Sequence, residues 1–228
     1  MDIDYISISR LGVFDTCNYK YKLQYHDHIK SPLPEPKFFK YGSLIHKYAE
    51  LTVKGEPFNG VPSEDYALVF PKHIENINKL IASLGKEGLT EHTFLLDYKG
   101  AAIKGVIDRL LLTPDGYRIV DYKSTKAGSW RKTQDNISID PQLNTYAWAV
   151  SEEFEVPVET IKAALYYVDD GTLITTSFTS EGVEKVMENL KYNYFKIKGM
   201  KPEDAEGNLK SCKWCNYRDG CAKRDERL

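Results

Sequence analysis

The stretch from Gly105 to Ser124, GVIDRLLLTPDGYRIVDYKS, constrains the fold of this chain more than any other stretch. Its two arms are apolar enough to lie in a protein interior, and the Pro-Asp-Gly run between them is typical of a hairpin turn. Each arm nevertheless carries an aspartate, Asp108 or Asp121, and Lys123 follows the second one by two residues. Because burying an unpaired charge costs several kcal/mol, these three charges need either partners or a function.

The length of the hairpin loop decides how the three charges are arranged. A two-residue Asp-Gly turn would pair Asp108 with Lys123, whereas a four-residue loop would pair Asp108 with Asp121. Both registers place the three charges on one face of the sheet, within about 5 to 8 Å of one another. A three-residue loop without a bulge would instead set Asp108 opposite Tyr122 and separate the charges.

Two carboxylates held close together repel each other unless a cation lies between them. The hard divalent ions Mg²⁺ and Mn²⁺ take oxygen ligands and retain several waters, so they suit such a pair. The three charged residues taken alone are equally consistent with an Asp-Asp-Lys ion-pair network that braces the hairpin. Motifs elsewhere in the chain have to decide between a metal site and a structural network.

The periodicity of the remaining sequence indicates an α/β fold. Helical spacing of apolar residues predicts helices over residues 10–25, with Ser9 as the N-cap, and over 41–55, 64–86, 140–153 and 180–198. Alternation predicts strands over residues 93–100, 101–112, 117–124, 161–170 and 172–179. This order predicts a mixed central sheet flanked by helices. The chain of 228 residues, 42% of them hydrophobic, is expected to form one domain over residues 1–228.

Charge and composition exclude several classes of protein. The net charge is −2 and the isoelectric point is near 6.2, so contact with nucleic acid has to come from local basic patches. No apolar run approaches the roughly 18 residues of a membrane span, and the N-terminal sequence lacks a secretory signal. We therefore expect a cytoplasmic protein that does not bind membranes.

Four motifs occur in order along the chain and give the hairpin a context. They are a helical GSLIH with His46, GVID with Asp108, DYK with Asp121 and Lys123, and QLNTY with Gln142 and Tyr146. In these motifs the chain resembles the RecB-like branch of the PD-(D/E)xK nuclease superfamily, from about Ser9 to Cys221. The resemblance implies a restriction-endonuclease-like fold and hydrolysis of phosphodiester bonds by a metal-activated water.

The resemblance also implies a role for each motif residue. Asp108 and Asp121 would bind Mg²⁺ or Mn²⁺, with His46 and the backbone carbonyl of Tyr122 as further ligands. Lys123 would position or activate the attacking water and offset the charge that grows on the phosphate.

The QLNTY motif would lie beside the active site. Its Gln142 and Tyr146 are four residues apart and therefore share one face of a helix. A helix that merely packs its tyrosine is the structural alternative. Independently of the resemblance, Glu91 lies just before the first predicted strand and could add a ligand for the metal or its water.

The cysteines suggest a second metal centre. Cys212, Cys215 and Cys221 form a CxxC-x5-C pattern, and Cys17 is the only other thiol in the chain. Chemistry alone allows either a four-thiolate Zn²⁺ site or an iron-sulphur cluster, and Cys17 by itself could be a buried core thiol.

The resemblance favours a 4Fe-4S cluster. A subset of the branch, which includes CRISPR-associated exonucleases and AddB-type helicase-nucleases, has one N-terminal and three C-terminal cysteines around such a cluster. That family often has Pro where this chain has Asn18. The implied organisation is a catalytic core over about 38–200, with residues 1–30 and 200–228 forming an iron-sulphur lobe that has a structural role.

Two basic segments with interleaved aromatics suggest where DNA would bind. Their candidate contacts are Lys126, Trp130, Arg131 and Lys132 after the second aspartate, and Trp214 in the cysteine tail. Cations bind phosphates and aromatic rings stack on unpaired bases, so single-stranded or end-frayed DNA is the expected partner. A solvated surface is the alternative for each of these residues. No base-reading motif is present, so no sequence specificity is expected.

Together these motifs predict a metal-dependent DNA exonuclease that serves recombination, repair or CRISPR adaptation. No Walker motif occurs, so any helicase would be a separate partner, and CRISPR adaptation proteins are a second class of expected partner. The alternative is a non-catalytic or endonucleolytic DNA-binding subunit of a larger complex. A zinc adaptor with an incidental acidic hairpin would leave the order of the motifs unexplained.

Overall fold

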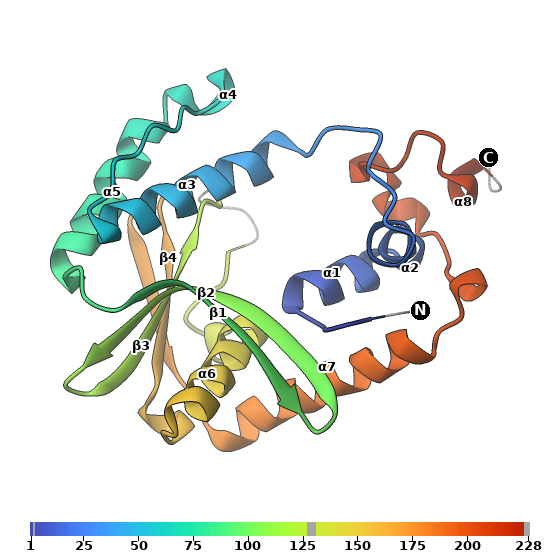
Figure 1. Ribbon diagram of the computed structural model, residues 1–228. Helices are drawn as coiled ribbons and strands as arrows, with labels where there is room; N and C mark the ends of the chain where they lie inside the picture. The colour runs from blue at the N-terminus through green and yellow to red at the C-terminus, as the bar shows by residue number, and fades with distance from the viewer. Residues whose placement is uncertain (2, 127–130, 226–228) are drawn as a thin grey trace. The chain divides into compact units, whose positions relative to one another are not determined.

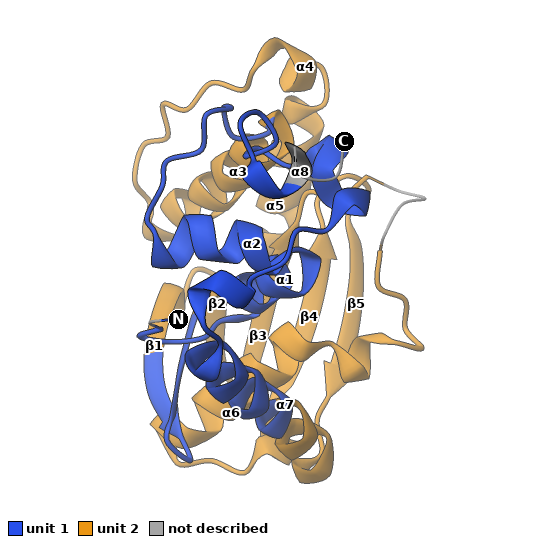
Figure 2. Ribbon diagram, turned by 90° about the vertical axis from the view of Figure 1, so that its right-hand side faces the viewer, with its two compact units in different colours: residues 1–36, 95–105, 187–228 blue, residues 37–94, 106–186 orange. Residues whose placement is uncertain are grey.

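The computed structural model describes residues 1, 3–126 and 131–225 of the chain. The chain forms two compact units, which Figure 2 shows in different colours. Unit 1 consists of residues 1–36, 95–105 and 187–228, and unit 2 consists of residues 37–94 and 106–186. Both chain ends belong to unit 1, and the candidate site residues of all four motifs, from His46 to Tyr146, belong to unit 2.

The described sheet is mixed, as its sequence pattern predicts (Figure 1). Its strands lie in chain order, and they are β1 (Leu89–Tyr98), β2 (Ala101–Thr113), β3 (Gly116–Lys123), β4 (Lys162–Tyr167) and β5 (Thr172–Ser177). β3 is antiparallel to β2 and parallel to β4, and β5 is antiparallel to β4. The parallel pair requires a long crossover, which contains helix α6 (Pro141–Phe154).

The other helices overlap the predicted ranges, except the last of them, for which the sequence predicts no helix. They are α1 (Ile8–Thr16), α2 (Asn18–Tyr21) with a π-helical turn (Lys22–His26), α3 (Lys37–Lys54), α4 (Glu64–Ala67), α5 (Phe70–Leu84), α7 (Ser180–Gly199) and α8 (Ala222–Asp225). Short 3-10 turns span Ile137–Ile139, Val158–Thr160, Pro202–Asp204 and Leu209–Trp214. Among the described residues, no helix combines the length and the apolar character needed to cross a membrane.

Two predicted helices are wrong in detail. The first begins earlier than predicted, because the side chain of Ser7, not Ser9, accepts a hydrogen bond from the Arg10 N–H (3.2 Å). It is also interrupted at Cys17, whose backbone is extended. The predicted helix over 64–86 is broken between α4 and α5, because Pro71 suits a helix start and is unfavourable in a helix interior.

The core of unit 2 lies between its sheet and two helices. Apolar side chains of α3 and α5 pack on one face of β3 and β4, among them Ile45, Ile77, Val120, Tyr122 and Tyr166. Figure 1 shows α3 and α5 running side by side over these strands. Because side chains alternate along a strand, the inward packing of Val120 and Tyr122 turns Asp121 and Lys123 to the other face, where α6 packs.

Unit 1 is assembled from segments far apart in sequence. Ile6 forms a short parallel bridge with β2, donating to the Ala102 carbonyl and accepting from the Lys104 N–H, both at 2.9 Å. The Met1 ammonium donates to carbonyls in the last turn of α7, including that of Ile197 at 3.3 Å. Cations are favourable at this end of a helix because of its dipole.

Candidate active site

The register of the β2–β3 hairpin brings the two aspartates together. Leu112 pairs with Tyr117 and Thr113 with Gly116, so the turn between the strands is Pro114–Asp115. The last pair given by this register is Arg109 with Val120, and the next position in line sets Asp108 against Asp121. This is the register predicted for a four-residue loop. The first and last residues of that loop, Thr113 and Gly116, also pair, which leaves a turn of two residues.

Asp108 is held from two sides. Its Oδ1 lies 3.2 Å from Nδ1 of His46 on α3, and its Oδ2 accepts a hydrogen bond from the Tyr122 N–H at 2.8 Å. Its side chain is only 9% exposed. Two different elements therefore fix the orientation of this carboxylate before any substrate arrives.

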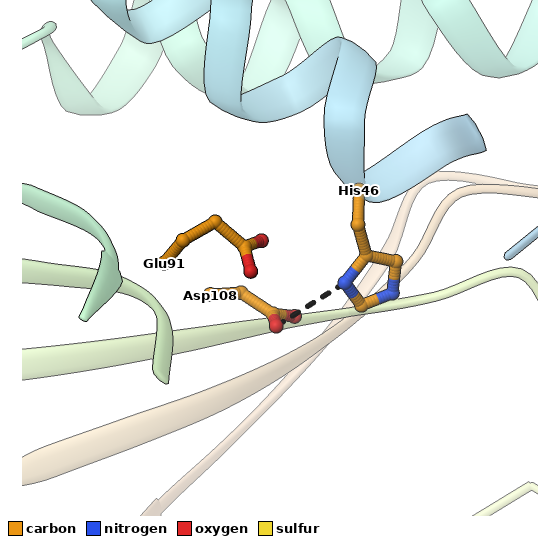
Figure 3. A group of neighbouring side chains, drawn as sticks. All are labelled: His46, Glu91 and Asp108. Carbon is orange, nitrogen blue, oxygen red and sulfur yellow. Dashed lines mark ion pairs between the residues drawn. The ribbon is translucent and has the colours of Figure 1, made fainter. Parts of the chain in front are cut away.

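Three side chains converge on a candidate metal site (Figure 3). His46 comes from α3, Glu91 from β1 and Asp108 from β2, and one ligand atom from each lies within 4.8 Å of the others. One imidazole nitrogen and two carboxylates form a donor set that suits a divalent ion. Among the described residues, the group includes Glu91, for which the sequence suggests an additional ligand role. It does not include Asp121, which the resemblance implies as a ligand.

Glu91 reaches the group with an unusual backbone. Its φ is +50°, in the left-handed region that residues other than glycine seldom adopt. Such conformations persist where the surrounding structure holds them, and they concentrate at functional sites. Burial, together with the charge of Asp108, raises the pKa of Glu91, which indicates a carboxylate that a cation would stabilise.

Asp121 is buried beside the group and is paired with Lys123. Its side chain is 1% exposed, and its Oδ2 lies 2.7 Å from the ammonium of Lys123. This contact is an ion pair that does not have the geometry of a hydrogen bond. Burial raises the pKa of Asp121, against the opposing charge of Lys123. The buried carboxylate is therefore compensated by a neighbouring cation.

A chain of hydrogen bonds holds Lys123 in place. Its ammonium donates to Oε1 of Gln142 (2.9 Å), and Nε2 of Gln142 donates to the hydroxyl of Tyr146 (2.7 Å). Gln142 and Tyr146 lie one turn apart on α6, whose N-cap Asp140 accepts from the N–H groups of Gln142 and Leu143. The helix therefore presents the glutamine between the lysine and the tyrosine.

The carboxylates of the site stabilise the protonated forms of His46 and Lys123. Burial alone would lower the pKa of His46, but the hydrogen bond and charge of Asp108 outweigh it and raise the pKa to about 9. Burial also opposes the charge of Lys123, yet Asp121 raises its pKa above the ordinary lysine value. The ammonium form of Lys123 is therefore favoured at neutral pH.

Comparison with known proteins places this geometry in a family. Residues 5–222, nearly the whole chain, match the PD-(D/E)XK nuclease superfamily. The chain belongs to this superfamily. It is therefore a nuclease with DNA as its substrate, from a group of enzymes that use divalent metals. No curated protein sequence matches it.

One of two similar solved structures shares the fold of this nuclease. A candidate exonuclease from Eubacterium rectale matches 99% of the chain and 89% of its own length, with a TM-score of 0.54 and 14% sequence identity. The crystal structure of SSO0001 covers 90% of the chain and 94% of its own, with a TM-score of 0.42 and 17% identity. At these identities the first likeness concerns the fold alone.

Part of the basic segment after Lys123 forms ion pairs and hydrogen bonds within the protein. The Arg131 guanidinium, whose side chain is 14% exposed, pairs with Asp170 (2.7 Å) and Asp169 (3.4 Å) and donates to the Thr125 carbonyl. It also lies over the Tyr167 ring. These contacts give Arg131 a packing role that the basic character of its segment does not reveal.

The other predicted DNA contacts are distributed over the nuclease. Lys126 is exposed, and Lys132 lies 3.5 Å from Asp140 and donates its N–H to the Tyr167 hydroxyl. Trp130 lies outside the described residues. Trp214 belongs to unit 1 and is 77% exposed, with Lys213 over its ring.

The four cysteines of the nuclease line one small pocket in unit 1. They form no disulfide, and all four are half-buried. Hydrogen bonds join their segments, because Tyr19 donates its backbone N–H to the Glu206 carbonyl (3.0 Å) and the Asn208 side-chain amide donates to the Thr16 carbonyl (2.9 Å). The sulphurs of Cys17 and Cys215 each accept a backbone N–H at 3.4 Å, from Lys20 and Tyr217 respectively.

Sequence reasoning missed a groove beside the candidate metal group. Its volume is about 610 Å³, and its lining includes His46 and Glu91 together with Phe38 and Phe39. The two phenylalanines escaped notice because the sequence predicts that α3 begins at Tyr41. Their spacing of seven and eight residues before His46 is the signal that could have placed them near the site.

Proposed function

We propose that this nuclease is a Mg²⁺- or Mn²⁺-dependent DNA exonuclease of the RecB-like branch, acting on single strands or DNA ends. The observation that carries the proposal is the hairpin register that sets Asp108 against Asp121, with Lys123 and His46 reaching the same place. The description of the Eubacterium rectale protein as a candidate exonuclease supports the same activity.

His46, Asp108 and Glu91 would hold the ion, with Asp121 as a further ligand from the next strand. The backbone carbonyl of Tyr122 would be a further ligand of the ion. When bound, the ion would polarise the phosphate and supply positive charge where negative charge develops.

Lys123 would supply the remaining charge. Its ammonium would hydrogen-bond the attacking water and stabilise negative charge on the phosphate. Gln142 leaves Lys123 less rotational freedom, because it accepts from the ammonium while Tyr146 accepts from Gln142. Gln142 and Tyr146 thus act as positioning residues, which reduces the entropy lost on reaching the transition state.

We also propose that Cys17, Cys212, Cys215 and Cys221 hold a structural 4Fe-4S cluster. In a tetrahedral Zn²⁺ site the Zn–S bonds of about 2.3 Å would place the sulphurs roughly 3.8 Å apart. Within the described residues, the cysteines are not among the groups whose ligand atoms lie within 4.8 Å of one another. A cluster, whose thiolates bind different iron atoms, accommodates wider spacing.

The proposed setting is recombination, repair or CRISPR adaptation in the cytoplasm, with a separate helicase or CRISPR adaptation proteins as partners. It rests on the resemblance of the motifs alone. The alternative is a non-catalytic or endonucleolytic subunit. The intact set of Asp108, Asp121 and Lys123, held together by the hairpin, argues against the non-catalytic form, because DNA binding alone does not need two buried carboxylates.

Degradation of labelled DNA tests the activity. Native protein with Mg²⁺ or Mn²⁺ is expected to release nucleotides from end-labelled linear DNA and to leave circular single strands intact. Asp108→Ala and Lys123→Ala should each lower the rate by at least about a hundredfold. Asp115→Asn changes an exposed carboxylate in the turn of the same hairpin and should retain activity. Cleavage of circles would indicate an endonuclease, and an inactive native protein would refute the enzyme.

Metal analysis of anaerobically purified protein tests the cluster. Four irons with matching sulphide and absorption near about 400 nm are expected, and both should be lost in Cys17→Ser. Stoichiometric zinc without iron would refute the cluster and leave the nuclease assignment unaffected.

A further inference from the structure

Two exposed aromatic rings stand at the start of α3. Phe38 and Phe39 are 55% and 56% exposed, although phenylalanine is usually buried. Their ring centroids are 4.4 Å apart with 38° between the planes, so they form one aromatic surface. Neither residue belongs to the core cluster of unit 2, so packing within the unit does not explain them.

The same rings line the groove that contains candidate metal ligands. Phe39, Ser43 and His46 are spaced i, i+4 and i+7, so they follow one stripe of α3 along the groove. At 1.5 Å per residue, Phe39 lies about 10 Å from His46 along the helix axis. Successive stacked nucleotides of one strand are about 3.4 Å apart, so this separation equals two or three nucleotides.

We propose that Phe38 and Phe39 stack on an unpaired base two or three nucleotides from the scissile phosphate. The inference rests on the proposed function and deepens it by assigning the residues that would contact an unpaired base of the substrate. Bases inside an intact duplex are stacked on each other, so only an unpaired base can offer its face to these rings.

The charges around the groove suit a DNA strand. Glu50 is its acidic residue away from the metal group, and its carboxylate is bound by Lys47 (2.8 Å) and Lys54 (2.6 Å). Lys40, next to Phe39, is exposed, and the hydroxyl residues Ser124 and Thr125 are part of the lining. Hydroxyls and cations contact phosphates, which suits the backbone of a DNA strand.

Binding of labelled single strands in EDTA tests the inference without cleavage. Oligo-dT carrying 2-aminopurine at one position should bind native protein with quenched fluorescence, because the base is stacked. The Phe38→Ala/Phe39→Ala variant should bind about five- to thirty-fold more weakly and lose the quenching. Its dependence on salt should be unchanged, because no charge is removed, whereas Lys40→Ala should reduce the salt slope by about one.

Two controls separate stacking from other causes. Tyr192→Ala removes an aromatic ring that is 64% exposed on α7, outside the groove, and should bind like native protein. Phe39→Trp should preserve the quenching, while Phe39→Leu, which keeps apolar bulk without a ring, should lose it. Equal binding and equal quenching with native protein and Phe39→Leu would overturn stacking, because leucine has no ring.

The outcome is distinguishable from failure of the proposed function. If native protein degrades DNA but the double alanine variant binds and degrades single strands as native protein does, the aromatic surface is refuted and the exonuclease stands. If native protein degrades no DNA but binds single strands through these rings, the activity is refuted and the base-stacking surface stands.

Discussion

His73 is a buried histidine that the catalytic motifs do not include. It is 2% exposed, its Nδ1 lies 2.7 Å from the Tyr41 hydroxyl, and its Nε2 lies 3.4 Å from Asp169. Burial lowers its pKa, although the charge of Asp169 opposes the shift. The folded protein therefore keeps this imidazole neutral at pH values where an unfolded chain would bind a proton.

Stability should consequently fall in mild acid. Below about pH 6.5 the unfolded chain takes up a proton at His73 that the folded state does not. The free energy of unfolding should then decrease by up to about 1.4 kcal/mol per pH unit, until the lowered folded pKa is reached. Urea unfolding between pH 5 and 7, spanning the unperturbed histidine pKa of about 6.5, should show a smaller loss for His73→Gln than for native protein. His28→Asn, at an exposed histidine, should behave like native protein; an identical slope for His73→Gln would contradict the prediction.

Gln142 should affect the rate of cleavage more than binding. Gln142→Ala removes the acceptor 2.9 Å from the Lys123 ammonium, and the freer lysine should lower kcat about tenfold. Single-turnover cleavage at saturating DNA measures this effect, and the dissociation constant in EDTA should stay the same. Gln134→Ala, whose side chain donates to the Thr175 carbonyl, is the control. A weakened affinity with an unchanged rate would assign Gln142 to DNA binding instead.

For single residues, the sequence predicts a position where that position depends on the local alternation of side chains. Asp108 and Asp121 could be placed together because strand alternation and a short turn leave few registers. Phe39 could not be placed, because its position depends on the start of α3, which lies four residues before the predicted one. Glu91 reaches the metal group through a left-handed backbone that no residue pattern announces.

At the scale of elements, the hairpin turn depends on Gly116. Its φ is +109°, and a Cβ there would lie 2.5 Å from the Thr160 carbonyl oxygen. Gly116→Ala should therefore lower the free energy of unfolding by about 1 to 3 kcal/mol, as measured with urea.

A second glycine provides the matched control. Gly12 lies inside α1, and a Cβ there would meet no atom within 4 Å. Gly12→Ala should stabilise the protein by roughly 0.5 to 1 kcal/mol, because alanine loses less backbone entropy in a helix. A stabilising Gly116→Ala would show that the turn relaxes without cost.

Elements were predicted well where periodicity is long and poorly where a single residue decides. α7 and β2 are close to their predicted ranges, because each is a long periodic run. The break between α4 and α5 follows from Pro71, whose ring is incompatible with a helix interior but suits a helix start.

At the scale of the whole molecule, the cysteines and the candidate active site belong to different units. If the cluster is structural, its loss should loosen unit 1 first. Amide hydrogen exchange of Cys17→Ser should be faster than native in residues 1–36 and 187–225, while α3 and β3 keep their protection. Loss of protection throughout both units would indicate that they unfold as one cooperative body.

The composition of unit 1 from both chain ends has a consequence for biosynthesis. Every segment of unit 2 has been synthesised by residue 186, whereas unit 1 still needs residues 187–228. Domains commonly begin to fold as they are synthesised. The strands that carry Asp108, Asp121 and Lys123 can therefore pair before Cys212, Cys215 and Cys221 exist. On a translating ribosome, the strands of the candidate active site can therefore form before the four cysteines are available to bind a metal centre.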